Sequence, residues 1–463
     1  MKQTIHQNKM GVKPVPTLML TMGLPMILSM MIQAFYNIVD SYFVSQIKDT
    51  SQIGNMGDCA VNALTLSFPI QMLIIAIGVG TGVGINSLLS KTLGENNKEK
   101  ASLIAGNATF LGICTYAIFL LFGLFGINTY LSSQTNDPII IELGTSYLYI
   151  CCVLSFGAVG SMIYEKLLQS TGKTVLSTIA QLIGALTNII LDPILIFGIG
   201  PFPQMGIKGA AAATVIGQIL TMIISMVFHY TINKEINGSV KYIKPDGKTI
   251  LNIYKIGIPA IIMQALMSVM SYGVNVIFGM VSAASVTAFG IYYKIQQFVF
   301  FAAFGMNNAI IPIVAFNYGK GDKKRIILSV KFGILYTLIL MLIGALALQL
   351  FANQICGVFS LSNETLTLCV RAIRIITLGY LFAGTNIALQ GIFQALGYGM
   401  RSLAVSAVRL IIAELPLAYI FAISANAEKL IWLSFPIAEF LGFVISLIYI
   451  RLTYKNTICN INA

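Results

Sequence analysis

Charged residues are scarce in this sequence of 463 residues: Asp, Glu, Lys and Arg make up 10%, whereas hydrophobic residues make up 57%. The mean hydropathy is +0.85. A water-soluble domain of this length could not bury so much apolar surface. The longest polar stretches, residues 1–16 and 233–248, are too short for a soluble catalytic or nucleic-acid-binding domain. We therefore expect the lipid bilayer to be the solvent of this chain.

Histidine and paired cysteines are also rare. The only histidines are His6 and His229, and neither lies beside a cluster of acids or cysteines. The seven cysteines form no Cys-x-x-Cys pair and lie mostly in apolar runs, so we interpret them as small apolar side chains. These absences leave no metal centre or activated nucleophile for a membrane enzyme. We expect no enzymatic activity and no cofactor.

Apolar runs long enough to cross about 30 Å of hydrocarbon recur along the whole chain. Breaks at Gly, Pro, Asn and charged residues predict an all-α membrane protein with twelve spans, at residues 17–46, 60–90, 101–127, 139–164, 175–199, 208–232, 251–281, 285–316, 326–352, 365–394, 402–423 and 430–450. We predict a cytoplasmic segment 1–16, an N-terminal six-helix lobe 17–232, a basic cytoplasmic linker 233–250, a C-terminal six-helix lobe 251–450 and a cytoplasmic tail 451–463.

Basic residues are distributed unevenly between the predicted loops. There are 28 Lys and Arg against 16 Asp and Glu, a net charge of +12. If both termini face the cytoplasm, the inner segments collect most of the basic residues and the outer loops keep only Lys48, Lys208 and Lys429. This asymmetry follows the positive-inside rule. The basic charge thus indicates membrane orientation rather than a nucleic-acid partner.

The two halves of the sequence repeat each other. Three stretches of the first half recur in order in the second: 23–25 at 257–259, the loop from Gly94 at the loop from Gly319, and 169–172 at 394–397. The last two matches share the same offset in the numbering. Because six spans per half is an even number, both halves start from the same face and form a parallel repeat. Such pairs usually bind substrate between them.

Ionisable side chains at membrane depth are costly, so each one is a functional candidate. The spacing of Gln33, Asn37 and Asp40 places them on one face of the first span. Such a polar stripe cannot face lipid. We predict that Asp40 belongs to a polar site inside the protein, with a purely structural role as the alternative.

The fifth predicted span repeats this device with Gln181, Asn188 and Asp192. Pro193 has no N–H to donate, so the carbonyl of Ile189 is left open near Asp192. Carboxylates together with an amide oxygen and an open carbonyl suit a proton or Na⁺. Apart from Na⁺ at Asp40, Asn188 and Asp192, we expect no bound metal ion. Capping or structural pairing of Asp192 is the alternative.

Polar residues of the second half are harder to assign. Gln264, Ser268, Ser271 and Asn275 form a one-faced stripe that we interpret as a cavity wall, with hydrogen bonding between helices as the alternative. Six charged residues could pair, gate the cavity or extend to the membrane surface, and we predict structural pairing for most: Lys294, Arg371, Arg374, Arg409, Glu414 and Glu439. We interpret Glu142, Glu165 and Lys166 as solvated residues near span ends.

Several stretches together resemble the multidrug and toxic compound extrusion (MATE) family and, more loosely, its MepA-like bacterial branch. They are 23–25 with 37–40, 78–84 leading into 91–94, 187–193, and 206–211. The resemblance implies two six-helix lobes in a V, a central cavity, and alternating access coupled to counterflow of H⁺ or Na⁺. We expect an exporter of amphipathic, often cationic, small molecules in a bacterial cell membrane, in contact with lipids and working as a monomer.

The resemblance also implies roles for individual residues. Asp40, Asn188 and Asp192 match the cation site of the family's amino lobe, and Tyr147 and Thr214 would complete it. Where sodium-coupled relatives carry acids in spans seven and ten, this chain has Gln264 and Asn386, which argues against a second sodium site. The residues expected to bind substrate are Gln33, Tyr36, Asn37, Gln264, Ser268, Ser271, Asn275 and Asn386.

A lipid-linked oligosaccharide or lipid flippase of the same superfamily is the main alternative. Such a protein would need a strongly cationic cavity for phosphates, and Arg371, Arg374 and Arg409 keep this alternative open. A membrane enzyme would need a catalytic cluster that is missing from the sequence. A structural or receptor-like protein would not need acids that face inward from the first and fifth spans.

Overall fold

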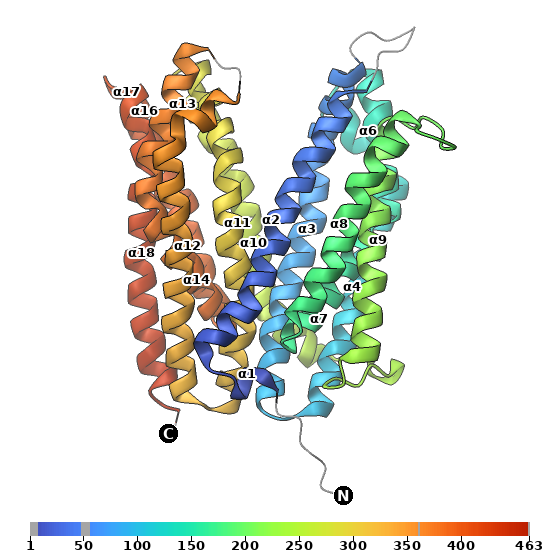
Figure 1. Cartoon of the computed structure of the whole chain (residues 1–463), viewed down its shortest axis with the longest axis vertical. Helices are drawn as coiled ribbons and strands as arrows, with labels where there is room; N and C mark the ends of the chain where they lie inside the picture. Colours follow the sequence, from blue (N-terminus) through green and yellow to red (C-terminus); the bar gives the residue numbers. More distant parts are fainter. Residues whose placement is uncertain (1–7, 48–55, 360–361, 462–463) are drawn as a thin grey trace, which may run out of the picture. The chain divides into compact units, whose positions relative to one another are not determined.

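The computed structural model describes residues 8–47, 56–359 and 362–461, without the side chains of Asn37 and Ser41. Nearly all of these residues are helical, and none of them forms a strand (Figure 1). Lys48, predicted to lie in an outer loop, is outside the described residues. The prediction of an all-α fold is confirmed.

The helices follow the predicted spans. In chain order they are α1 (Lys9–Val12), α2 (Val15–Ser45), α3 (Met56–Gly94), α4 (Lys98–Phe125), α5 (Ile127–Ser132), α6 (Pro138–Val153), α7 (Phe156–Ser170), α8 (Thr174–Phe197), α9 (Ile207–Ile232), α10 (Gly247–Gly279), α11 (Ala283–Lys320), α12 (Lys323–Gly357), α13 (Asn363–Ile376), α14 (Tyr380–Ala395), α15 (Gly399–Ala407), α16 (Glu414–Ala422), α17 (Ala427–Leu430) and α18 (Ser434–Thr453). Short 3₁₀ turns occupy Val240–Tyr242, Thr377–Gly379 and Ile431–Leu433. Wider π turns occupy Val408–Ile412 and Tyr454–Ile458.

The number of membrane spans agrees with the prediction. Within the described ranges, 11 helices or continuous helical runs are long and apolar enough to cross a membrane. α6 and α7 pass the same test together but are bent by 43° at the short break between them. Counted as one broken span, this pair brings the total to the predicted 12.

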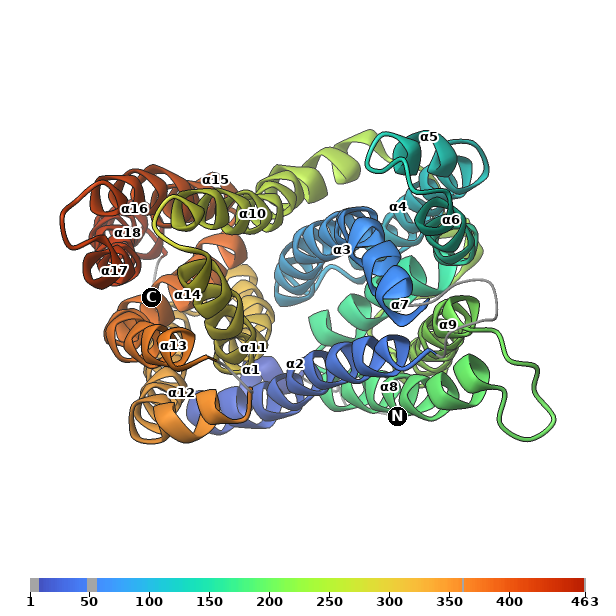
Figure 2. The same ribbon diagram turned by 90° about the horizontal axis from the view of Figure 1, so that it is seen from above.

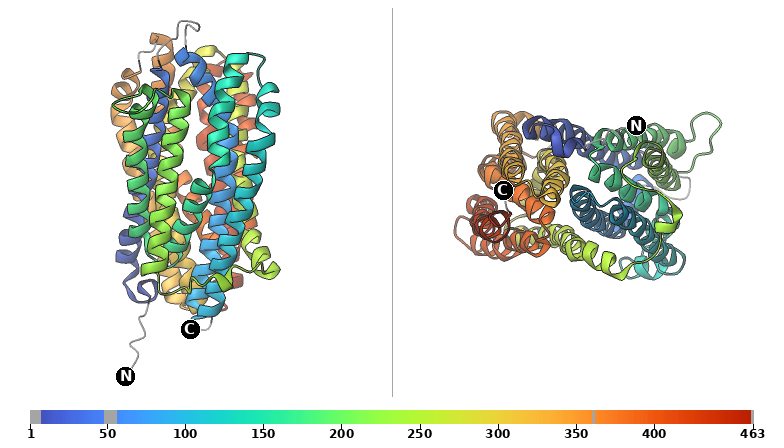
Figure 3. Two further views of the ribbon diagram at one scale, coloured as in Figure 1. Left: turned by 90° about the vertical axis from the view of Figure 1, so that its right-hand side faces the viewer. Right: turned by 90° about the horizontal axis from the view of Figure 1, so that it is seen from below.

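The chain folds into two compact units. One consists of Met1–Met30, Ser90–Asn96 and Ile253–Ala463, and the other of Met31–Leu89 and Asn97–Asn252. We name them the C-terminal unit and the N-terminal unit after the half of the sequence that supplies most of each. Within each unit the long helices run side by side (Figures 2 and 3). The residue limits predicted for the lobes and the linker stay a prediction.

The parallel repeat is visible in where the helices begin. α4, α6 and α8 begin at Lys98, Pro138 and Thr174, and α12, α13 and α15 begin at Lys323, Asn363 and Gly399, each at the same offset from its counterpart. The caps repeat as well. Asn97 accepts a hydrogen bond from the backbone N–H of Lys100, and Asp322 accepts one from that of Arg325, both at 3.0 Å. These side chains satisfy N–H groups that have no partner at the start of a helix. The predicted repeat is confirmed.

Each unit has one almost fully buried helix, α7 in the N-terminal unit and α14 in the C-terminal unit. Both end in the same turn, in which Gly172 and Gly397 have φ of +83° and +85°. The backbone N–H of Lys173 then donates to Leu168 at 2.8 Å, and that of Tyr398 donates to Phe393 at 2.7 Å. Glycine tolerates this left-handed conformation, which explains the repeated glycine after each helix.

A second repeated pair of glycines lies where the end of α3 crosses the end of α11, inside the C-terminal unit. A Cβ atom added to Gly94 would lie 2.0 Å from the carbonyl oxygen of Phe316. One added to Gly319 would lie 1.9 Å from that of Lys91. Lys91 and Phe316 are themselves equivalent positions of the repeat, so each helix places its glycine against the equivalent carbonyl of the other. The crossing requires glycine at both positions.

We expect Gly319→Ala to destabilise the protein although alanine favours helix formation. The added methyl group would collide with the Lys91 carbonyl, and such overpacking costs about 1–3 kcal/mol. The control is Gly290→Ala in the same helix, where no atom lies within 4 Å of the added Cβ, and where alanine should stabilise by up to about 1 kcal/mol. The measurement is thermal unfolding in detergent. Equal melting temperatures for the two variants would contradict the tight crossing.

Candidate ion-binding site

The predicted cluster on α8 forms as expected from its spacing. Asn188 and Asp192 are one turn apart and buried, with exposed fractions of 3% and 0%. The Asn188 amide Nδ2 donates to Asp192 Oδ1 at 3.2 Å and to Thr214 Oγ1 of α9 at 3.3 Å. One amide group therefore joins three of the five residues predicted to bind the ion.

Three oxygens of this region are buried without a hydrogen-bond partner in the described part of the chain. They are Asp40 Oδ1, Asn188 Oδ1 and Asp192 Oδ2. Pro193, inside α8, adds the carbonyl of Ile189, which has no helical N–H partner. A buried acceptor without a partner is costly unless a ligand, a water or a proton satisfies it. Oxygen atoms of this kind are the ligands that hard cations prefer.

Asp40 on α2 belongs to the same region. Its carboxyl group lies close enough to that of Asp192 for the two charges to interact. The phenol group of Tyr36, one turn earlier on α2, interacts electrostatically with both carboxyl groups and hydrogen-bonds to Gln33. The side chain of Asn37, predicted to share this face, lies outside the described residues. Two acids from helices that are far apart in the sequence thus belong to one polar region of the N-terminal unit.

Tyr147 on α6 completes the predicted set. It is buried, with an exposed fraction of 1%, and interacts electrostatically with Asp40. Gln71 on α3 donates a hydrogen bond from Nε2 to Tyr147 Oη at 2.8 Å and so orients the phenol group. Gln71 could not be recognised from the sequence, because its partner Tyr147 lies on another helix, far away in the sequence.

The interpretation of Glu165 and Lys166 as solvated residues is wrong. Both are on the buried helix α7, with exposed fractions of 6% and 8%. Gln181 donates to Glu165 Oε2 at 2.5 Å, and Lys166 Nζ donates to Gln169 Oε1 at 2.9 Å. Position along the chain suggested a span end, but α7 is the second part of a bent span and lies inside its unit. Glu142, by contrast, is exposed as predicted.

The polar stripe of α10 is divided between different surroundings. Gln264 lines a cavity of the C-terminal unit, and Ser271 is half-buried. Ser268 and Asn275 are exposed. Asn386 on α14 is fully buried, and its amide donates to Glu439 Oε2 at 2.9 Å while its Oδ1 accepts from Ser446 at 2.9 Å. The structure therefore does not bring these predicted substrate-binding residues together.

Structural pairing was predicted for most of the six unassigned charged residues, and two of them, Arg409 and Glu439, form an ion pair. Arg409 Nε and Nη2 donate to Glu439 Oε1 at 3.0 and 2.5 Å. Glu414 is buried and accepts from Ser434 at 2.7 Å. The remaining three lie nearer the protein surface: Lys294 and Arg374 are exposed, and Arg371 is half-buried.

No group of three or more His, Cys, Asp and Glu side chains that could hold a metal ion occurs in residues 8–47, 56–359 and 362–461. An ion at Asp40 and Asp192 would therefore depend on the amide oxygen of Asn188, the hydroxyl of Thr214 and the open carbonyl of Ile189 as further oxygen ligands. Oxygen ligands of this kind fit Na⁺, and either carboxylate can instead take a proton.

Two curated relatives extend over almost the whole chain. A FAD transporter of Shewanella oneidensis is 26% identical over 444 residues, which cover 92% of each protein. The multidrug export protein MepA of Staphylococcus aureus is 23% identical over 441 residues, 95% of this chain and 94% of MepA. Both comparisons include the two units together.

Solved structures show the same fold. An outward-facing multidrug resistance MATE family transporter of the MOP superfamily has a TM-score of 0.90 at 21% identity and covers 98% of this chain and 99% of its own. A MOP superfamily transporter from Pyrococcus furiosus, whose binding pocket is described as having reverse polarity, has a TM-score of 0.85 at 21% identity. The match covers 98% of this chain and 99% of that transporter.

The family model named MatE matches residues 25–194 and 259–420, well over half of the chain, with one match in each half of the repeat. Members of the MATE family are membrane transporters rather than enzymes, and the many apolar helices of this chain make it a multi-pass membrane protein. The chain belongs to the MatE family of multidrug efflux transporters and is similar to its MepA-type members.

Proposed function

We propose that this protein is a secondary active antiporter that exports amphipathic, often cationic, small molecules in exchange for H⁺ or Na⁺ by alternating access. One observation carries the proposal: Asp40 and Asp192 of the N-terminal unit lie within range of electrostatic interaction, and each has a buried oxygen without a hydrogen-bond partner in the described structure. A membrane protein that needed these acids only for stability would be expected to satisfy those oxygens. An exchangeable ion supplies the missing partner.

The coupling follows from the shared carboxylates. A proton or Na⁺ on Asp40 and Asp192 neutralises the charge that attracts a cationic substrate, so the ion and the substrate favour different states of the site. Asn188 donates to one oxygen of Asp192, and the other oxygen has no hydrogen-bond partner among the described residues. We propose that the site binds either the coupling ion or the substrate's charge, and that Tyr147 and Thr214 orient it.

The energetics favour the use of both acids. Export of one positive charge against the membrane potential costs about 2.3 kcal/mol per 100 mV. One proton that enters in exchange regains this electrical work and supplies a further amount of about 1.4 kcal/mol for each pH unit. One proton per cation therefore leaves a narrow margin, whereas two carboxyl groups allow two protons for each exported molecule.

The charges of the C-terminal unit weigh against the flippase alternative. A site for lipid phosphates needs several unpaired cations, but Arg409 is paired with Glu439, and Arg374 lies at the surface. The name of MepA favours drug export, whereas that of the Shewanella relative points to an anionic nucleotide cofactor. The acids of the N-terminal unit favour cations over anions for the present chain.

We further propose a bacterial cell membrane as the location, with both termini in the cytoplasm and the monomer as the working form. Within the C-terminal unit, Arg325 Nη2 donates to the carbonyls of Met10 and Lys13 at 2.8 Å. Lys323 Nζ donates to the carbonyl of Cys459 at 3.0 Å. The N-terminal helix, the turn between α11 and α12 and the tail therefore meet at one basic end, which the positive-inside rule places in the cytoplasm.

Cys459 offers a direct test of this orientation because it is the exposed cysteine among the seven, the others being buried or half-buried. A membrane-impermeant thiol reagent should label the protein in inside-out vesicles and leave it unlabelled in right-side-out vesicles. Cys459→Ser should remove the labelling. Labelling of Cys459 in right-side-out vesicles alone would reverse the proposed orientation.

Transport itself is tested with ethidium in vesicles that carry an imposed pH gradient or an imposed Na⁺ gradient. One gradient should drive efflux, and Asp40→Asn and Asp192→Asn should each lower the rate at least tenfold. Asp137→Asn is the matched control, because Asp137 caps α6 outside the site and asparagine caps a helix equally well. Wild-type efflux in both site variants would remove these acids from the mechanism.

A further inference from the structure

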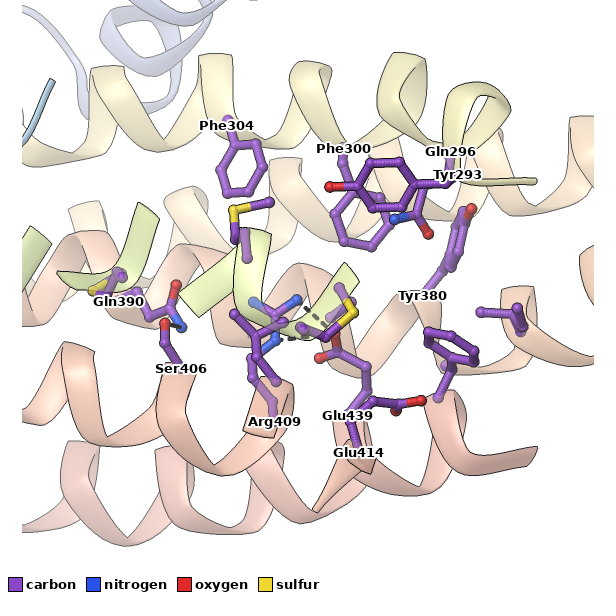
Figure 4. A pocket seen from close by; sticks show the side chains of 18 of the residues that line it. Tyr293, Gln296, Phe300, Phe304, Tyr380, Gln390, Ser406, Arg409, Glu414 and Glu439 are labelled. Carbon is purple, nitrogen blue, oxygen red and sulfur yellow. Dashed lines mark hydrogen bonds and ion pairs between the residues drawn. The ribbon is translucent and has the colours of Figure 1, made fainter. Parts of the chain in front are cut away.

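The C-terminal unit contains a cavity of about 80 Å³ enclosed by α10, α11, α13 to α16 and α18 (Figure 4). This volume exceeds the space that a single water needs, which is about 10–15 Å³ on the same scale. The cavity is built from the second half of the sequence and shares no residue with the site of Asp40 and Asp192. Its walls combine three features, namely aromatic rings, one closed ion pair and one further acid.

Aromatic side chains supply much of the wall. They come from α11, α14 and α18 and are Tyr292, Tyr293, Phe300, Phe304, Tyr380 and Phe435. Tyr292 Oη and Tyr380 Oη lie 3.3 Å apart in a hydrogen bond, and the ring of Phe300 lies 5.3 Å from that of Tyr380 with its edge toward it. These contacts fix the rings before any ligand enters. Fixed aromatic faces attract cations and stack with other rings.

Arg409 and Glu439 form a closed pair in this wall. Two N–H groups of the guanidinium donate to Glu439 Oε1, and Asn386 donates to Oε2. The carboxylate of Glu439 therefore has donors on both oxygens. Arg409 itself lies in the π turn Val408–Ile412, in which the Ala413 N–H donates to the Val408 carbonyl at 2.8 Å. Pro416, further along, has no N–H to donate to the carbonyl of Ile412.

Glu414 is the second acid of the cavity wall and does not take part in this ion pair. It lines the cavity with an exposed fraction of 2%, and its hydrogen-bond donor is the neutral hydroxyl of Ser434 at 2.7 Å. The cavity wall holds one basic and two acidic side chains, so one negative charge is uncompensated when all three are ionised. A buried carboxylate with a neutral donor alone is unfavourable until a positive partner joins it.

We propose that this cavity binds an aromatic molecule with one positive charge, for which Glu414 is the counter-charge and the fixed rings are the stacking surface. The acid selects the charge, and Tyr292, Tyr293 and Phe435 select a ring of limited size. The proposal rests on the proposed function only in that the ligand would be an exported molecule. The binding itself needs no ion gradient and can be measured on the full chain in detergent.

Trp432, the one tryptophan in the sequence, provides the signal. It is buried, its ring lies 5.0 Å from that of Phe278, and Phe278 lies 6.3 Å from Phe435 in the cavity wall. The probe is phenyltrimethylammonium, a permanent cation with one ring, and its neutral counterpart is tert-butylbenzene, which has the same shape. The cation should change the Trp432 fluorescence saturably and should bind at least tenfold more tightly than tert-butylbenzene.

Glu414→Gln should weaken binding of the cation at least tenfold without changing that of tert-butylbenzene. Glu414→Asp keeps the charge and should bind within a few-fold of the wild type, which separates loss of charge from loss of fold. Glu364→Gln, at an exposed acid of the same unit, should bind normally. Equal affinity of the cation for the wild type and Glu414→Gln would overturn the proposal, as would loss of binding in Asp40→Asn.

This experiment also separates the proposal from the proposed function. Saturable binding that depends on Glu414, without ethidium efflux under either gradient, would support the cavity and reject the antiporter. Efflux driven by one gradient would support the antiporter. If the cation then changed the Trp432 fluorescence equally in the wild type and in Glu414→Gln, the cavity proposal would be rejected.

Discussion

A carboxylate inside an apolar helical bundle must find a partner, and this requirement connects the polar features of the protein. Asp192 is fully buried, one of its oxygens accepts from Asn188, and the other has no partner among the described residues. Asp40 adds a second acid with an open oxygen nearby. The surrounding bilayer offers no hydrogen-bond donors, and its low dielectric constant stabilises a charge poorly. An ion that can enter and leave is therefore the natural partner.

The repeat shows how one scaffold carries two kinds of polar contact. Glu165 and Gln181 of the N-terminal unit lie at the positions of Gln390 and Ser406 in the C-terminal unit. Gln181 donates to Glu165, and Gln390 donates to Ser406 at 2.8 Å. The contact between neighbouring helices is kept, but its charge is lost in the second unit. There the charge appears instead on Glu414, in the helical segment that corresponds to the Asp192 helix.

Much of the fold could be predicted from the sequence, because few backbone structures can satisfy their hydrogen bonds inside a bilayer. The spans follow from the lengths of the apolar runs, and the repeat from glycines such as Gly172 and Gly397, whose positive φ values admit few other residues. The group of Asn188 and Asp192 was predictable because spacing on one helix determines the shared face. These are local properties of the chain.

Contacts between helices could not be predicted in the same way. Arg409 and Glu439 are far apart in the sequence, and nothing in their spacing shows that they pair. Gln71 and Tyr147 meet across two helices for the same reason. The burial of Lys166 depends on a bend between α6 and α7 that places the end of α7 inside the unit. Such features require the packed structure.

The central claim is that Asp40 and Asp192 act as one site, and a double-variant cycle tests it most directly. Ethidium efflux is compared in Asp40→Asn, Asp192→Asn and the variant that carries both changes, under whichever gradient drives the wild type. Residues that act as a unit lose their function together, so the double variant should be no slower than the slower single variant. Rate losses that multiply in the double variant would show two independent sites and contradict the account.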